Sequence, residues 1–71
     1  MGVRGDNDTF FLQLMIRHHQ GGIEMAGYAA QHSTTTIVRQ TAVSMIDEQA
    51  QDIQYMTILL KQRIAAPLPY P

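Results

Sequence analysis

The sequence predicts an all-α protein, an antiparallel two-helix hairpin, and three observations support this fold class. Apolar residues recur at steps of three and four along two long stretches, which is the period of a helix with a buried face. A short hydroxyl cluster, Ser33-Thr34-Thr35-Thr36, separates the stretches, and so short a connection makes consecutive helices antiparallel neighbours. Proline is confined to the last five residues, so neither stretch is interrupted.

The first helix is expected from about residue 9 to about residue 31, because Asn7 and Asp8 are favourable N-caps. One stripe of this helix is predicted to form the core side; its members are Phe11, Met15, His18, Gly22, Met25 and Ala29. Gly21 and Gly22 lie in mid-helix, where each glycine costs roughly 1 kcal/mol relative to alanine. We therefore expect either a close approach of another helix at Gly22 or a bend there.

The second helix is expected from about residue 35 to about residue 64, with its N-cap at Ser33 or Thr34. Its stripe comprises Val38, Thr41, Met45, Glu48, Asp52, Met56, Leu59 and Arg63. Residues 65–71 contain three prolines and are predicted to be an extended tail. The whole chain, residues 1–71, is then a single helical-hairpin domain.

The predicted hairpin is too small to bury all of its apolar residues. A chain of this size buries only about 60% of the surface that it exposes when unfolded. Several large apolar residues lie off the two main stripes, so each helix has more than one apolar face; they include Ile16, Ile23, Tyr28, Ile37, Ile46 and Ile58. We therefore predict that two hairpins pair, as a homodimer, into a four-helix bundle with two-fold symmetry.

Composition argues against several classes of partner. The formal net charge is −1, which argues against nucleic acid or an anionic membrane as the main partner. No run approaches the roughly 20 apolar residues of a membrane span. The first residues contain no apolar core of a signal peptide, so no export signal is expected in this chain. Cysteine is absent, which excludes a disulfide or a thiolate metal site.

The first helix also contains the residues that point to metal chemistry. Met15 precedes His18 by three positions and His19 by four, and Met25 follows His18 by seven, so these residues share one side of a helix. Thioether and imidazole groups suit copper, above all Cu(I), whereas Mg²⁺ and Ca²⁺ prefer oxygen ligands. Met25 lies roughly 10 Å along the axis from His18, which favours two sites or a site shared between subunits.

Two interpretations of the histidines remain open from spacing. In one, a His18–Asp52 hydrogen bond fixes the register between the helices. In the other, the carboxylate orients a histidine that binds metal, and Met56 or His19 completes the site. Adjacent helical residues point about 100° apart, so one histidine should face the core and the other a flank or a partner subunit. Met45 and Met56, taken singly, are interpreted as core filler.

No pattern in the sequence indicates catalysis. There is no His-Glu-x-x-His motif of zinc proteases, and no Glu-x-x-His pair of carboxylate-bridged di-iron bundles. We also find no nucleophile–base pair, phosphate loop or acid/base dyad placed by spacing. His32 is interpreted as a helix C-terminal residue favoured by the helix dipole. We therefore expect that the protein is not an enzyme.

The run from Phe11 to Ala26, with Met15-Ile16-Arg17-His18-His19-Gln20 at its centre and Met25-Ala26 at its end, resembles the signature of the bacterial domain-of-unknown-function family 305. The second helix resembles the family's Gln-x-x-Glu-Ile-x-x-Met pattern, because Gln49, Ile53 and Met56 are at the matching positions. Asp52 stands where the family has glutamate, and Gly22 where alanine is usual.

The resemblance implies a ferritin-like helical bundle and an association with copper binding or copper tolerance. It implies that the metal ligands are Met15, His18, His19, Met25 and Met56, with Gln49 and Asp52 as companions. Family members are often exported, so the resemblance suggests an exported or periplasmic protein. The competing hypothesis is a structural or protein-interaction module in which the histidines only set core register, and methionine-rich helical faces serve as adaptable docking surfaces.

Overall fold

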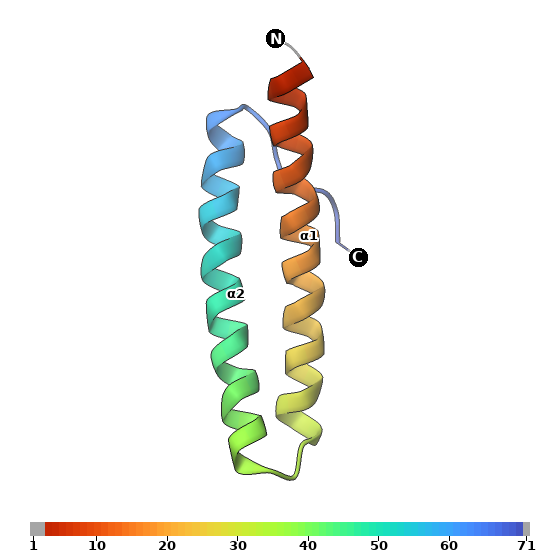
Figure 1. The fold of residues 1–71 in the computed structure, drawn as a ribbon, viewed down its shortest axis with the longest axis vertical. Helices are drawn as coiled ribbons and strands as arrows, with labels where there is room; N and C mark the ends of the chain where they lie inside the picture. Colours follow the sequence, from red (N-terminus) through yellow and green to blue (C-terminus); the bar gives the residue numbers. More distant parts are fainter. Residues whose placement is uncertain (1–2, 71) are drawn as a thin grey trace.

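The protein is a long antiparallel pair of helices. The computed structural model describes residues 3–70, with side chains from residue 7 onward, and places them in α1 (Val3–His32) and α2 (Thr36–Gln62). The pair measures 51 × 19 × 15 Å, and a non-helical tail, residues 65–70, returns from α2 to lie beside α1 (Figure 1). The prediction of an all-α hairpin is confirmed. Neither helix within the described range is long and apolar enough to cross a membrane.

The first helix begins earlier than expected. It starts at Val3, so Asn7 and Asp8 lie inside the helix and the prediction that one of them caps it is wrong. The Asp8 carboxylate instead accepts a hydrogen bond from Arg63, whose Nη2 lies 3.5 Å from Asp8 Oδ2. Asp8 lies five residues inside the helix, beyond the first turn whose free N–H groups a cap would bind.

The connection between the helices is held by Ser33 and Arg39. The N-cap of α2 is Thr35, in extended conformation and without a side-chain capping bond, rather than the expected Ser33 or Thr34. Ser33 Oγ accepts the backbone N–H of Thr35 at 3.2 Å, and Arg39 Nη1 donates to the Ser33 carbonyl at 3.0 Å. At the other end of this turn His32 lies in the last turn of α1, where its ring packs 4.1 Å from that of Tyr28.

The second helix ends in a reversal that directs the tail. It ends at Gln62, two residues before the expected end, and Ile64 has a positive φ of 55°. The Arg63 and Ala65 backbone N–H groups both donate to the Leu60 carbonyl, at 2.9 and 3.0 Å. The chain therefore doubles back at Ile64, and Ala65 packs against the apolar core.

The residues that are buried between the two helices, here called the seam, differ from the predicted stripes. Leu12, Ile16 and Leu60 form a buried cluster near the tail, and Ala26 and Ala42 are buried near the connection. By contrast Phe11 and Met25, which belong to the predicted core stripe, are 59% and 75% exposed. The seam is thus rotated by one residue, about 100°, from the expected face, and the assignment of the stripe to the core was wrong. Each of two paired helices can bury only one face against the other. The period of apolar residues does not indicate which of two adjacent apolar faces that will be.

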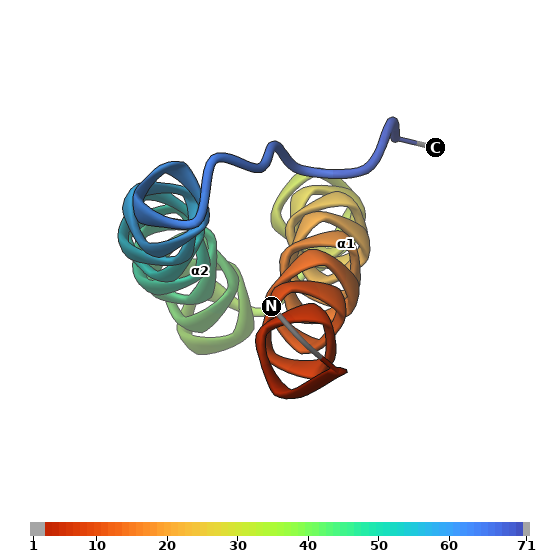
Figure 2. The ribbon, with the colours of Figure 1, turned by 90° about the horizontal axis from the view of Figure 1, so that it is seen from above.

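Three contacts across the hairpin share one register. Asp8 meets Arg63, His19 meets Asp52, and Gly22 meets Gln49, so residue i of α1 lies level with residue 71−i of α2. Residues of both predicted stripes line one hollow on a flank of the pair: His18, Gly22, Met25 and Ala29 of α1 with Val38, Thr41 and Met45 of α2. The helical period continues this flank through Phe11 and Met15 of α1 and through Asp52 and Met56 of α2. We call the whole flank the open face. Viewed down the helices, the tail runs along the other flank (Figure 2).

Candidate functional site

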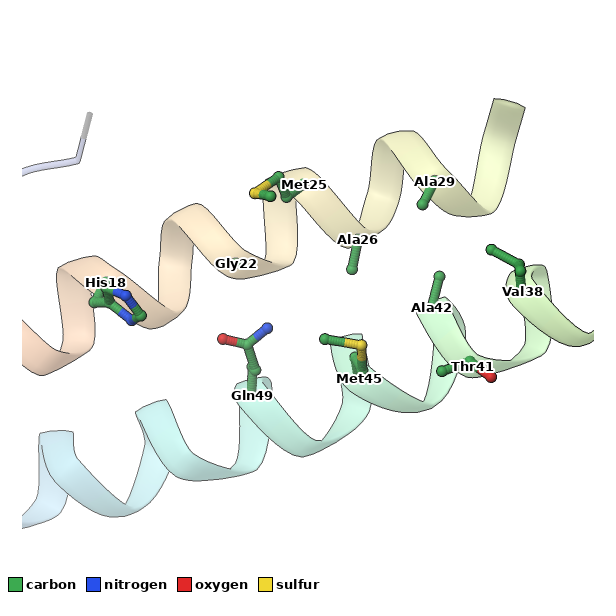
Figure 3. A pocket seen from close by; sticks show the side chains of 10 residues that line it. All are labelled: His18, Gly22, Met25, Ala26, Ala29, Val38, Thr41, Ala42, Met45 and Gln49. Carbon is green, nitrogen blue, oxygen red and sulfur yellow. The ribbon is translucent and has the colours of Figure 1, made fainter. Parts of the chain in front are cut away.

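The open face is hollowed into a groove near the connection between the helices. Its volume is about 560 Å³, and most of its walls are apolar. The lining residues are His18, Gly22, Met25, Ala26, Ala29, Val38, Thr41, Ala42, Met45 and Gln49. In Figure 3 Gln49 and Met45 point from α2 toward α1, and Ala26 and Ala42 face each other across the two helices. The lining of the groove therefore includes two methionine thioethers, the His18 imidazole and the Gln49 amide.

Gly22 allows Gln49 to reach across the groove. A Cβ at Gly22 would overlap the Gln49 side chain, whose Cδ would lie 2.8 Å away. The expected close approach at Gly22 is therefore confirmed, although the approaching group is a side-chain amide. A Cβ at Gly21 would meet only the Tyr70 hydroxyl, at 3.8 Å, which is an ordinary contact. Only the second glycine of the pair is needed for interhelical packing.

The two histidines have different environments. His19 lies between the helices with its side chain 17% exposed; its Nδ1 is 2.8 Å from the Met15 carbonyl and its Nε2 is 3.3 Å from Asp52 Oδ2. His18 is exposed and lines the groove. The partner of Asp52 is thus His19, and the expectation that His18 fills this role was wrong because the seam is rotated by one residue. The expectation that one histidine faces the core and the other a flank is confirmed.

Each ring nitrogen of His19 faces a hydrogen-bond acceptor. Nδ1 faces the Met15 carbonyl within α1, and Nε2 faces the Asp52 carboxylate of α2. A neutral imidazole has one N–H and can donate to only one of these acceptors, whereas an imidazolium donates to both. The contact with Asp52 is the one that joins α1 to α2.

The methionines fall into two groups along the open face. By the common register, Met15 lies level with Met56, one turn from His18, and Met25 lies one residue out of level with Met45. Met15 and Met56 are half-buried, and Met56 packs against the Leu12–Ile16–Leu60 cluster. Met25 and Met45 are 75% and 45% exposed in the groove. The structure therefore brings Met15 and Met56 to the same level and leaves Met25 nearly three turns away from them.

Two residues of this surface were missed as functional candidates or assigned another role. Met45 was interpreted as core filler but lines the groove, and Gln49 was only a motif companion but extends into it. The position of Met45 on the predicted stripe, with Thr41 four residues earlier, was the available signal. No cluster of three or more His, Cys, Asp or Glu side chains suited to a metal ion occurs among the described residues. Any metal site on this face would therefore depend on thioethers.

Comparison with known proteins identifies a family for the chain. A search of curated proteins and a search of solved structures found no match. The family model described as "Domain of unknown function (DUF305)" matches residues 3–60, which include both helices almost completely and the residues of the open face. The family assignment made from the sequence is confirmed, and the chain belongs to the DUF305 family.

Proposed function

We propose that this protein is a non-catalytic metal-binding protein that takes up copper, as Cu(I), through methionine and histidine side chains of the open face. The observation that supports this best is the level position of Met15 and Met56, one helical turn from the exposed His18. Two thioethers and one imidazole form a soft ligand set that favours Cu(I) over Mg²⁺, Ca²⁺ or Mn²⁺. These residues therefore fit the metal that the family resemblance implies.

The remaining ligand candidates have distinct roles in this proposal. Met15, Met56 and His18 form one group, and Met25 with Met45 forms a second group two turns along the face. His19 stands behind the first group, where its contact with the Met15 carbonyl orients the ring within α1 and its contact with Asp52 holds α1 against α2. Its Nε2 could act as a ligand only if it gave up this contact with Asp52. Bound copper would supply a redox-active cation, which suits copper handling or tolerance.

We also propose that a second copy covers the open face and completes a ferritin-like four-helix bundle. A folded monomer of this mass has an accessible surface of about 4,450 Å², whereas the hairpin, at 8.0 kDa, exposes 5351 Å². The excess of about 900 Å² is close to the roughly 800 Å² that each partner buries in an interface of standard size. Large apolar side chains, Phe11, Met25 and Val38, stay exposed on this face.

A two-fold dimer would double the ligand set at mid-length of the hairpin. His18, His19 and Asp52 lie near the middle of the helices, so a two-fold axis through the centre of the open face sets them beside their counterparts. A soft site formed by Met15, Met56 and His18 could then gain its missing ligand from the partner. This arrangement explains how one short chain could hold copper without cysteine.

Competition against a Cu(I) chelator tests this function. The purified protein is compared with a Met15→Leu/His18→Ala variant, and with His32→Ala as a matched control, because His32 lies at the far end of α1 against Tyr28. We expect copper retention by the wild type and the control, and its loss in the double variant with the helical signal unchanged. Equal and negligible retention in all three proteins would refute the proposal.

The groove also supports a second candidate function, a protein-interaction module. Its volume of about 560 Å³ and its mostly apolar walls suit an inserted side chain of a partner. Single substitutions separate the two functions, since His18→Ala leaves the His19–Asp52 contact intact whereas His19→Ala removes it. A copper protein loses uptake with His18→Ala at unchanged stability. If the protein is an interaction module in which the histidines only set register, His18→Ala leaves copper uptake equal to that of the wild type. His19→Ala then lowers the folding stability.

A further inference from the structure

The tail, residues 65–70, is attached to α1 by polar contacts along its length. Gln13 Nε2 donates to the Ala66 carbonyl at 2.9 Å, and Arg17 Nη2 donates to the Pro69 carbonyl at 3.4 Å. The Tyr70 hydroxyl donates to Glu24 Oε1 at 3.2 Å. These contacts lie on the flank of α1 that is turned away from the open face (Figure 2). The tail therefore supports the back of the helix segment whose front bears Met15 and His18.

The contacts advance along both segments in the same direction. An extended chain rises about 3.1 Å per residue, roughly twice the 1.5 Å rise of a helix, so each tail residue passes about two helix residues. From Ala66 to Tyr70 the tail advances four residues, about 12 Å, while its contacts on α1 advance eleven residues from Gln13 to Glu24, about 16 Å. The tail thus runs parallel to α1 and is held at Gln13, Arg17 and Glu24.

The far end of the tail reaches the weakest part of α1. Gly21 and Gly22 each lower helix propensity about fivefold relative to alanine. The Tyr70 hydroxyl lies 3.8 Å from the position that a Cβ of Gly21 would take, and Gln49 fills the corresponding space at Gly22. The glycine pair is therefore flanked by Tyr70 on the tail side and by Gln49 on the open face.

We propose that the tail is a splint that keeps the Gly21–Gly22 segment of α1 helical, and that Tyr70, which contacts Glu24 and lies beside Gly21, is the tail residue that acts on this segment. The tail lies beyond residues 3–60, the part that matches the family model, whereas the α1 residues that it contacts lie within that part. The inference rests on helix geometry and these contacts and not on the proposed copper function. Loss of copper binding in a protein with an intact splint would refute only the latter.

Amide hydrogen exchange of the full chain, measured residue by residue by NMR, tests the splint. We expect Tyr70→Ala to lower protection of the amides at residues 21–25 about fivefold, with little change at residues 42–46 of α2. Adding Gly21→Ala should restore protection, because the new methyl group replaces lost helix propensity and meets no close neighbour once Tyr70 is gone. Tyr55→Ala is the matched control, since Tyr55 is 64% exposed on α2.

Three outcomes would overturn the proposal. They are unchanged protection at residues 21–25 in Tyr70→Ala, an equal loss along both helices, and a failure of Gly21→Ala to restore protection. Where Tyr70→Ala does not fold, Tyr70→Phe decides, because it removes only the hydroxyl that donates to Glu24. A smaller local loss in Tyr70→Phe, reversed by Gly21→Ala, supports the splint, and protection equal to that of the wild type refutes it.

Discussion

Substitution of Gly22 by alanine tests the packing at the centre of the hairpin. The change adds a Cβ that would overlap the Gln49 amide, whose Cδ would be 2.8 Å away. Alanine gains about 1 kcal/mol of helix propensity. Gln49 must move to a less favourable rotamer and lose its packing on α1, which costs about 1 kcal/mol. We therefore expect Gly22→Ala to be nearly neutral, with the Gln49 side chain moved away from α1.

The other glycines of α1 provide matched controls. A Cβ at Gly27 meets nothing within 4 Å, and one at Gly21 meets only the Tyr70 hydroxyl. Both Gly21→Ala and Gly27→Ala should therefore raise the free energy of unfolding by about 1 kcal/mol. In a Gln49→Ala background the obstacle at Gly22 disappears, so Gly22→Ala should also stabilise by about 1 kcal/mol, a coupling that a double-mutant cycle measures directly.

Urea unfolding followed by circular dichroism gives these free energies, at one fixed protein concentration because association would change the apparent stability. The reasoning is refuted if Gly22→Ala stabilises the wild-type chain as much as Gly27→Ala does. It is also refuted if Gln49→Ala leaves the effect of Gly22→Ala unchanged. The first result would mean that the Gln49 side chain does not pack tightly against α1 at Gly22 and has no part in holding the helices together.

Three further predictions concern the tail, a surface ion pair and assembly. Desolvation, followed by the hydrogen bond to Glu24 and the charge of Glu24, raises the pKa of Tyr70 above its usual 10.0. The contribution of Tyr70 to stability is therefore present below pH 10 and is lost as the pH rises through the raised pKa. Glu24→Gln should lower the pKa of Tyr70, which is measured by tyrosinate absorbance. Asp8→Asn should cost less than about 1 kcal/mol in urea unfolding, because its contact with Arg63 at 3.5 Å is exposed; a larger loss would contradict this. Met25→Glu places a charge on the open face and should give monomers by light scattering at low micromolar concentration where the wild type is a dimer, and a folded wild-type monomer would end the dimer proposal.

The hairpin was predictable because its signals are local. The three- and four-residue period, the hydroxyl cluster before Thr36 and the prolines after Ala66 each act within a few residues of the chain. The face that α1 buries was not predictable in the same way. Leu12 and Ile16 compete with Phe11 and Met15 for the seam, and the outcome depends on the small Ala26 and Ala42 that let the helices approach.

The candidate site was predictable in composition but not in pairing. Helical spacing placed Met15 and His18 on one predicted stripe and Met56 on the other, and the register between the two stripes is known only from the structure of the hairpin. The exchange of His18 for His19 as the partner of Asp52 follows from the same rotation of one residue. The bond from Tyr70 to Glu24 joins residues 46 positions apart, and no period in the sequence indicates a contact between an irregular segment and a helix flank.

The left-handed backbone conformation of Ile64 introduces strain where the tail begins. A β-branched residue at a φ of 55° is held in a conformation that costs about 1–2 kcal/mol, and the contacts of the tail with α1 must offset this cost. When the tail detaches from α1, Ile64 can return to an ordinary backbone conformation, so the tail detaches more readily than its hydrogen bonds alone would indicate. Glycine at position 64 would remove this strain and favour the attached tail. Because the side chain of Ile64 is exposed, this substitution would change the attachment of the tail without altering the core or the open face.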